Sequence, residues 1–313
     1  MTETKPSTAD QADRSDSPPD GWIDRYMPAW IRGYLKLARV DRPIGTWLLF
    51  WPCVWSALLA AATTGHAPPA GAILLFGVGA FVMRGAGCTY NDIIDRDFDA
   101  KVARTAARPI PAGAVSVRGA TVFLVLQLMC GLTVLVQFNG LTIAVGFGSM
   151  VLVLTYPFMK RITYWPQAWL GLTFNWGALV GWTAVTGSFA WTALAVYAAG
   201  FFWTLGYDTI YAHQDKEDDA LVGVKSSALA LGGQTVPFVI GCYTAAIALL
   251  ALAIGLTTFS WAAMALLLAA AFHMTWQVAS LDIDDAANCL ARFKSNRDTG
   301  LLIAAAMYAA IVY

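Results

Sequence analysis

The chain contains a series of long apolar stretches that charged residues hardly interrupt. An α-helix needs about 20 apolar residues to cross the roughly 30 Å hydrocarbon core of a bilayer. Eight stretches approach or exceed that length: 43–64, 70–90, 117–137, 140–158, 165–186, 190–210, 236–256 and 259–280. A ninth, from about 299 to the end, is short, so its helix either begins further back or ends at the far interface. This pattern predicts an all-α polytopic membrane protein.

The composition agrees with a membrane protein and excludes several other classes. Hydrophobic residues make up 58% of the chain and charged residues 13%, whereas a soluble domain carries about 25% charged residues. The 20 basic and 20 acidic residues cancel, so no basic excess is available for nucleic acid. The five cysteines lack CxxC spacing and, except for Cys289, lie in apolar stretches. They are predicted to be small core residues.

The charges indicate how the helices are oriented. The short connections 65–69, 138–139, 187–189 and 257–258 contain no charged residue. The longer connections, 91–116, 159–164, 211–235 and 281–298, contain many Lys and Arg residues. By the positive-inside rule the N-terminus and all long loops face the cytoplasm. We therefore expect a multi-pass protein of the bacterial inner (cytoplasmic) membrane.

Three regions are predicted along the chain. Residues 1–20 are polar and rich in acids and proline, which predicts a disordered cytoplasmic tail. They lack the apolar core of a signal peptide, and their acids argue against a mitochondrial transit peptide. Residues 21–42 mix aromatic and basic residues, as an amphipathic interfacial helix does. Residues 43–313 form the transmembrane domain.

Two acidic clusters stand at the ends of apolar stretches. Asn91, Asp95 and Asp99 are four residues apart, so a helix would place them on one face. Asp208, Asp215 and Asp219 would share a face by steps of seven and four. Solvated loops are the alternative interpretation. The helical spacing and the start of each cluster inside an apolar span favour a functional site.

Carboxylates from two facing helices would form an oxygen-only site for a hard cation. Mg²⁺ prefers such ligands and bridges to substrate phosphates. Bases lie near both clusters, among them Arg108, Lys160, Arg161 and Lys225. Acids, metal and bases together suit a diphosphate leaving group. The motif lacks the alternating ligands and the central glycine of a calcium-binding loop.

These motifs resemble those of the UbiA family of intramembrane prenyltransferases. Asn91-Asp92-x-x-Asp95-Arg96-x-x-Asp99, followed by Arg108-Pro109-Ile110-Pro111-x-Gly113, is similar to the first family signature. Tyr207-Asp208-Thr209-x-Tyr211-Ala212-x-x-Asp215-x-x-Asp218-Asp219 is similar to the second, although His213-Gln214 departs from its commonest wording. Asp41-Arg42-Pro43-Ile44-Gly45 and Tyr156-Pro157-Phe158-Met159-Lys160-Arg161 resemble the branch that prenylates 4-hydroxybenzoate. The resemblance runs from about residue 36 to the end.

The resemblance implies a fold, a reaction and a set of site residues. The fold would be nine transmembrane helices around a central cavity, capped by cytoplasmic loops. The reaction would transfer a polyprenyl group from its diphosphate to the ring carbon ortho to the hydroxyl of 4-hydroxybenzoate, for ubiquinone synthesis. The implied metal ligands for Mg²⁺ are Asn91, Asp95, Asp99, Asp215 and Asp219, with Asp95 and Asp215 essential for catalysis. Tyr156, Lys160 and Arg161 would contact the diphosphate or the nascent cation, and Arg108 would assist.

Three polar residues in or beside the spans have two interpretations each. Arg84 either pairs with an acid of the first cluster or meets substrate, or else it snorkels to the interface. Asn175 bonds either a neighbouring helix or the phenol of the substrate. Arg42 either pairs with the benzoate carboxylate or anchors the chain at the membrane interface.

Two alternative functions remain at this point. One is prenyl transfer to another acceptor, of the menaquinone, haem or chlorophyll type. The other is a cation-coupled transporter, which is disfavoured because transporter sites usually lie in broken helices at the midplane. The lipid bilayer and the two substrates are the expected partners, and no protein partner is predicted.

Overall fold

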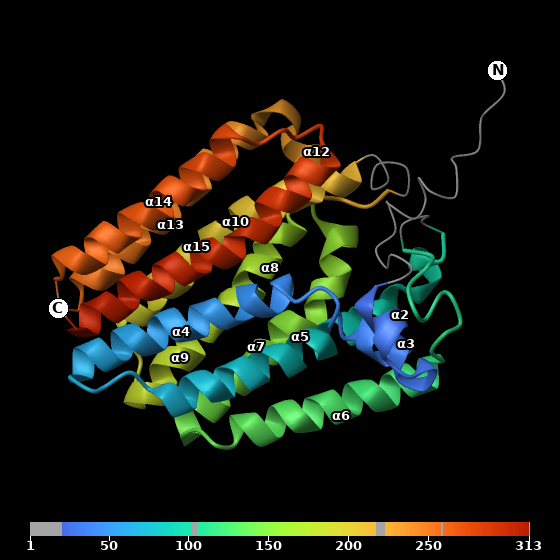
Figure 1. The fold of residues 1–313 in the computed structure, drawn as a ribbon, viewed down its shortest axis with the longest axis horizontal. Coiled ribbons are helices and arrows are strands. Elements are labelled where there is room, and N and C mark those ends of the chain that lie inside the picture. Colours follow the sequence, from blue (N-terminus) through green and yellow to red (C-terminus); the bar gives the residue numbers. More distant parts are fainter. Residues whose placement is uncertain (1–20, 102–104, 217–222, 258, 313) are drawn as a thin grey trace. The chain divides into compact units, whose positions relative to one another are not determined.

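The computed structural model describes residues 21–101, 105–216, 223–257 and 259–312 (Figure 1). All regular secondary structure in these ranges is helical, which confirms the all-α prediction. Among the described helices, six are long and apolar enough to span a membrane. A count of nine spans is therefore not confirmed. The predicted tail, 1–20, lies outside the described residues.

The chain divides into two compact units, which are described separately. The first contains Met1–Pro43 and Phe81–Thr133, and the second contains Ile44–Ala80 and Val134–Tyr313. The helices of the first unit are α2 (Trp22–Tyr26), α3 (Ala29–Leu37), the part of α5 (Ala70–Asp99) from Phe81 onward, and most of α6 (Val117–Leu135).

The first unit is held by a small apolar core beneath α3. Leu37, Ile110, Val115 and Ala120 form this core. Gly33 lets α3 approach the loop 108–116 closely, since a Cβ on Gly33 would lie 2.5 Å from Val115 Cγ2. The core therefore fixes the loop 108–116 to α3.

Helices α2 and α3 show the amphipathic pattern expected for residues 21–42. Trp22, Tyr26 and Trp30 are exposed, whereas Ile23 and Leu37 are buried. Tryptophan and tyrosine are enriched where a membrane meets water. The interfacial position of this segment stays a prediction.

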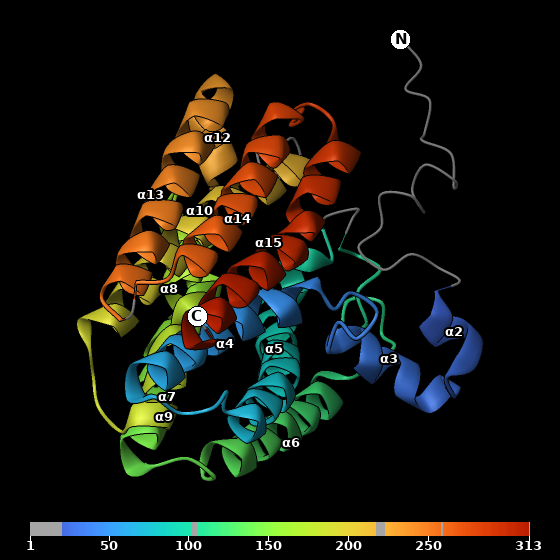
Figure 2. The ribbon, with the colours of Figure 1, turned by 60° about the vertical axis from the view of Figure 1, so that its left-hand side comes forward.

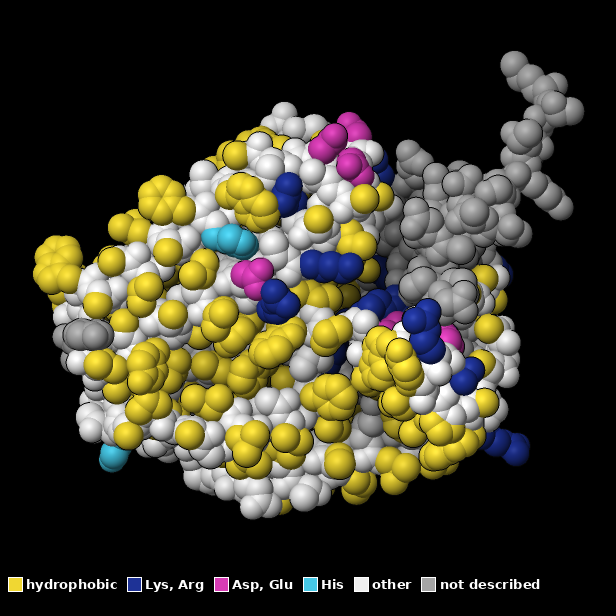
Figure 3. Space-filling view, in the orientation of Figure 1, with side chains coloured by type: hydrophobic (Ala, Val, Ile, Leu, Met, Phe, Trp, Pro, Cys, Tyr) yellow, Lys and Arg dark blue, Asp and Glu magenta, His cyan; other side chains and the backbone are white. Residues whose placement is uncertain are grey.

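The second unit contains the remaining helices. They are α4 (Ile44–Thr64), α7 (Gly140–Ile162), α8 (Pro166–Asn175), α9 (Gly177–Thr186), α10 (Trp191–Ala212), α12 (Ser227–Leu231), α13 (Thr235–Gly255), α14 (Trp261–Ala279), α15 (Ala286–Val312) and two short 3₁₀ turns, η1 (His213–Asp215) and η2 (Gly232–Gln234). Figures 1 and 2 show α13, α14 and α15 side by side, and α10 packs against α8, α13 and α15. Hydrophobic side chains cover most of the face that α4, α14 and α15 present in Figure 3.

Small residues allow α4 and α9 to pack closely. Gly177 and Gly181 stand four apart on α9, the small-xxx-small spacing common at membrane helix interfaces. A Cβ at Gly181 would lie 2.2 Å from the carbonyl oxygen of Cys53 on α4. The backbones of the two helices thus meet where the side chains are absent.

Three buried polar side chains of the second unit bond to neighbouring helices. Trp55 Nε1 donates to the carbonyl oxygen of Gly300 at 2.9 Å, and Trp203 Nε1 donates to Asn296 Oδ1 at 2.8 Å. Tyr243 Oη donates to Gln277 Oε1 at 2.8 Å. These bonds join α4, α10, α13 and α14 to one another or to α15. These hydrogen bonds offset the free energy that burying the polar groups away from water would otherwise cost.

Two helices differ from the predicted spans. The span 165–186 is divided into α8 and α9 at Trp176, next to Asn175, whose Nδ2 donates to the carbonyl oxygen of Gly171 at 2.9 Å. Such a side chain competes with the regular backbone bonds of a helix. The ninth stretch follows one of its two predicted outcomes, since its helix, α15, begins further back, at Ala286, and carries the mostly polar segment 292–298 in its first half.

Replacing Gly181 with alanine tests the packing of α4 on α9. We expect Gly181→Ala to destabilise the protein by about 1–3 kcal/mol, since the backbone of α4 has to shift. The control is Gly241→Ala on α13, where an added Cβ meets nothing within 4 Å. There alanine should be neutral or stabilising. Thermal melting of the detergent-solubilised protein measures both; equal melting temperatures would contradict the close packing.

Candidate functional site

The first acidic cluster forms the last turns of α5. Asp95 is fully buried and Asp99 nearly so, while Asn91 is partly exposed. Because all three lie on a continuous helix, their spacing of four places them on one face. Asp92, one residue from Asn91, is also buried and lies three residues before Asp95.

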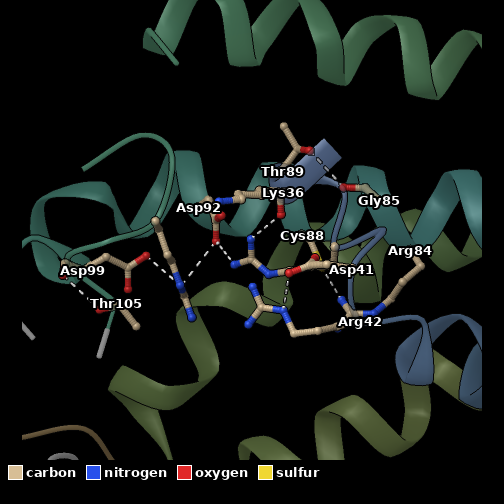
Figure 4. Close-up of polar contacts among 12 residues, drawn as sticks. Lys36, Asp41, Arg42, Arg84, Gly85, Cys88, Thr89, Asp92, Asp99 and Thr105 are labelled. Carbon is tan, nitrogen blue, oxygen red and sulfur yellow. Dashed lines mark hydrogen bonds and ion pairs between the residues drawn. The ribbon is translucent and has the colours of Figure 1, made fainter. Parts of the chain in front are cut away.

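A network of ion pairs surrounds this part of α5 (Figure 4). Arg108 Nη1 lies 2.8 Å from Asp99 Oδ2 and 3.3 Å from Asp92 Oδ1. The same Asp92 oxygen lies 3.0 Å from Arg39 Nη2. All four side chains are at least 88% buried, so these pairs are weakly screened by solvent.

The loop after α5 positions Arg108. Thr105 Oγ1 donates to the carbonyl oxygen of Asp99 at 2.9 Å, which ties the segment from Thr105 onward to the end of α5. The turn at 108–115 is closed by backbone bonds, including Val115 N to the carbonyl oxygen of Pro109 at 2.9 Å. Gly113 adopts a φ of +72°, which favours glycine. Arg108 therefore reaches α5 from a turn that backbone hydrogen bonds close.

Arg42 and Arg84 also lie in the first unit. Arg42 Nε is 3.2 Å from Asp41 Oδ2. Arg84 donates from Nη1 to Cys88 Sγ, one turn further along α5 (Figure 4). Roles of these two arginines in substrate binding stay predictions.

The second acidic cluster belongs to the second unit and departs from a regular helix. Helix α10 ends at Ala212 and continues as the 3₁₀ turn η1, so the step from Asp208 to Asp215 does not run along a single α-helix. Asp208 is partly buried in the last turn of α10. The side chain of Asp215 and all of Asp219 lie outside the described residues.

The end of α7 carries three of the predicted site residues. Tyr156 and the bases Lys160 and Arg161 occupy its last turns. Lys225 N donates to the carbonyl oxygen of Lys160 at 3.0 Å, and Lys225 Nζ donates to that of Ile162 at 3.1 Å. The structure therefore anchors the segment after the second acidic cluster to the end of the helix that bears Lys160 and Arg161.

Asn175 bonds a neighbouring helix. Its Nδ2 donates to Thr204 Oγ1 on α10 at 2.7 Å, and Thr204 Oγ1 donates in turn to Tyr207 Oη at 3.0 Å. Asn175 Oδ1 is buried and has no hydrogen-bond partner among the described residues. This contact supports the helix-bonding interpretation of Asn175, and a bond to a substrate phenol stays a prediction.

The described residues bear on the predicted metal site only through the first cluster. Asn91 and Asp95 offer an amide oxygen and a carboxylate one helical turn apart, which are hard oxygen ligands of the kind that Mg²⁺ takes. Asp99, a third predicted ligand, is held by Arg108. Within the part of the chain that is described, no group of three His, Cys, Asp or Glu side chains is placed to hold a metal by itself.

Sequence reasoning did not single out Asp92 or Arg39. Asp92 precedes Asp95 by three residues, whereas Asn91 precedes it by four. Residues three apart are also neighbours on a helix surface, so Asp92 lies beside the predicted face. Arg39 looked like one of several bases before the first span. The tertiary structure brings it 53 residues along the chain to Asp92.

The sequence was compared with known proteins. A model of the UbiA prenyltransferase family matches residues 49–307. The mitochondrial 4-hydroxybenzoate polyprenyltransferase of Arabidopsis thaliana is 51% identical over 283 residues, covering 90% of this chain and 69% of the relative. The human protein of the same name is 50% identical over 280 residues, covering 88% and 74%.

Solved structures share the fold. The apo structure of a UbiA homolog from Aeropyrum pernix K1 has a TM-score of 0.67 at 23% identity, covering 84% of this chain and 96% of its own. A UbiA homolog from Archaeoglobus fulgidus, bound to GPP and Mg²⁺, has a TM-score of 0.65 at 20% identity, covering 90% and 100%. The described helices therefore adopt the architecture of these membrane proteins.

The relatives correct the predicted location. A bacterial inner membrane is wrong by this comparison, because the relatives from Arabidopsis, human and rat are named as mitochondrial proteins. Hydropathy and loop charge report that a chain crosses a bilayer and which side its bases face. They carry no information about which organelle or cell contains that bilayer, so the prediction went beyond its physical basis.

The pH dependence of stability tests the environment of His213. Burial, and to a lesser extent the charge of Lys216, lowers the pKa of this imidazole, which shares a 2.8 Å hydrogen bond with Thr235 Oγ1. The unfolded chain takes up the proton below about pH 6.5, whereas the folded chain resists it. Stability should therefore fall as the pH drops through this range.

We expect His213→Gln to reduce the loss of melting temperature between about pH 7.5 and 5.5. His66→Gln is the control, because His66 is exposed and bonds only locally to Thr64. An unchanged pH dependence in His213→Gln would contradict the role assigned to the buried imidazole.

Proposed function

The chain belongs to the UbiA prenyltransferase family, and from this premise we propose that it transfers a polyprenyl group from polyprenyl diphosphate to 4-hydroxybenzoate, releasing diphosphate. The observation that carries the proposal is the buried acidic face of α5, with Arg108 held against it. Relatives of about 50% identity are named for this reaction. The family excludes the transporter alternative.

The first cluster supplies oxygen ligands for a divalent cation. We infer Mg²⁺ as that cation, held by Asn91, Asp95, Asp99, Asp215 and Asp219. When bound, it supplies positive charge that neutralises the diphosphate and so weakens the allylic C–O bond. The chemistry of the first donor set, an amide and carboxylates on one helical face, supports this assignment.

The bases act on the same leaving group. Lys160, Arg161 and Arg108 bind and orient the diphosphate, and their fixed charge stabilises it as it departs. Tyr156 lies on α7 one turn before Lys160. Its aromatic ring stabilises the nascent allylic cation by cation–π attraction. Arg84 and Arg42 contribute to substrate binding, with Arg42 pairing with the carboxylate of the benzoate.

The acceptor carbon is the one ortho to the phenol. Its attack on the allylic cation forms the new C–C bond, and loss of the ring proton restores aromaticity. A carbocation survives only where water is excluded. The apolar helices of the chain meet that requirement. The product is a prenylated hydroxybenzoate of ubiquinone synthesis, made in a mitochondrial membrane as the names of the relatives favour.

The proposal predicts Mg²⁺-dependent transfer by membranes that contain the protein. Membranes with labelled 4-hydroxybenzoate, a polyprenyl diphosphate and Mg²⁺ should form a labelled prenylated product, and a metal chelator should abolish it. Naphthoate and haem acceptors, supplied in parallel, should give none. No product from the benzoate under any Mg²⁺ concentration would overturn the proposed activity.

Removing a proposed metal ligand should abolish turnover without preventing membrane insertion. We expect Asp95→Ala and Asp215→Ala each to lower kcat by roughly 100-fold or more, because charge development at the leaving group is no longer balanced. Asp97→Ala is the matched control, since Asp97 lies on the same helix with its side chain 84% exposed. Near-normal turnover in both ligand variants would contradict the metal assignment.

A further inference from the structure

Asp92 and Arg39 form a buried ion pair next to the proposed ligands. Arg39 follows α3, and its Nη1 also donates to the carbonyl oxygen of Lys36 at 2.9 Å. Asp92 Oδ1 accepts two hydrogen bonds, one from Arg39 and one from Arg108. Asp92 Oδ2 is buried without a hydrogen-bond partner among the described residues. The contacts of this carboxylate are thus made with two arginines from different segments.

The backbone at Arg39 is unusual. Its φ is +55°, in the left-handed region, and it is the one non-glycine residue with positive φ among those described. Such a conformation costs free energy and persists only where the surroundings hold it. The end of α3 provides that hold, because Val40 N donates to the carbonyl oxygen of Leu35 at 3.1 Å and Arg39 N donates to that of Lys36 at 3.1 Å. The turn that these bonds close brings the Arg39 guanidinium, 10% exposed, to Asp92.

Arg108 is shared between two carboxylates through one nitrogen. Nη1 is 2.8 Å from Asp99 and 3.3 Å from Asp92. Asp99 is a proposed cation ligand, so every increase in the attraction of Arg108 to Asp99 opposes binding of a cation there. Asp92 competes with Asp99 for the position of this nitrogen, and Arg39 keeps Asp92 in place.

We infer that Asp92 is a positioning residue for the reaction: held by Arg39, it shares Arg108 and so keeps Asp99 available to the divalent cation. The inference rests on the proposed function. It assigns Asp92 no direct contact with metal or substrate, and it gives Arg39 a role that the motifs did not reveal.

The test compares Mg²⁺ binding in variants of the full chain. Asp92→Asn combined with Arg39→Asn removes the pair without changing net charge, and asparagine tolerates the left-handed backbone at position 39. Arg108 is then no longer drawn toward position 92. The Mg²⁺ concentration at half-maximal thermal stabilisation of the purified protein should rise about tenfold, equivalent to about 1.4 kcal/mol. Asp92→Asn alone, which leaves residue 39 unaltered, serves as the second variant if the double variant shows no melting transition.

A double-mutant cycle identifies the route of the effect. In an Arg108→Gln background the same substitutions should change the Mg²⁺ midpoint less than about threefold, because the shared arginine is gone. Asp24→Asn is the control, since Asp24 pairs with Lys36 at 2.8 Å in the same unit but away from the acidic cluster. It should leave the midpoint unchanged.

The inference is overturned if the folded pair variants keep the wild-type midpoint, or if the tenfold change persists without Arg108. This outcome differs from failure of the proposed function. In that case the wild-type protein would form no prenylated benzoate, whatever the Mg²⁺ midpoints of the variants.

Discussion

Hydrocarbon provides no water to solvate a polar group, and this constraint governs both units of the structure. A polar atom buried among the helices has to find a partner on the protein or carry a desolvation cost. The indole nitrogens of Trp55 and Trp203 meet it by bonding α15. Asn175 Nδ2, Thr204 and Tyr207 meet it as a chain of hydrogen bonds between α8 and α10. Hydrogen bonds that would add little stability in water therefore help to hold these helices together.

The same constraint explains why the acidic face of α5 is arranged as it is. Asp92 and Asp99 are nearly inaccessible, and buried carboxylates need opposite charge close by. Arg39 and Arg108 supply it from either side of α5 in the sequence. Both arginines depend on the small core of Leu37, Ile110, Val115 and Ala120, which fixes α3 and the loop 108–116. An apolar cluster of modest size therefore sets the electrostatics of the proposed site.

Local sequence pattern accounts for most of the helices and for the first cluster. The predicted apolar stretches begin within a few residues of the helices that they correspond to, because a helix in a bilayer has to be apolar along its length. These helices are α4, α5, α6, α7, α10, α13 and α14. Hydropathy does not show the division of 165–186 beside Asn175, and it leaves the start of α15 open because the first half of that helix is polar. At the second cluster α10 gives way to a 3₁₀ turn at His213, and a shared face for its acids stays a prediction.

The order of residues along the chain was enough to predict a helical, membrane-spanning protein with Asn91, Asp95 and Asp99 on one helical face. These properties depend on spacing and polarity, which are local. Only the tertiary structure decided that Arg39 pairs with Asp92, that Arg108 is divided between two carboxylates, and that Lys225 joins the end of α7. Such contacts link segments separated by up to 65 positions (160 to 225), and the Coulomb energy between two charges depends on their distance in space, which no local pattern contains.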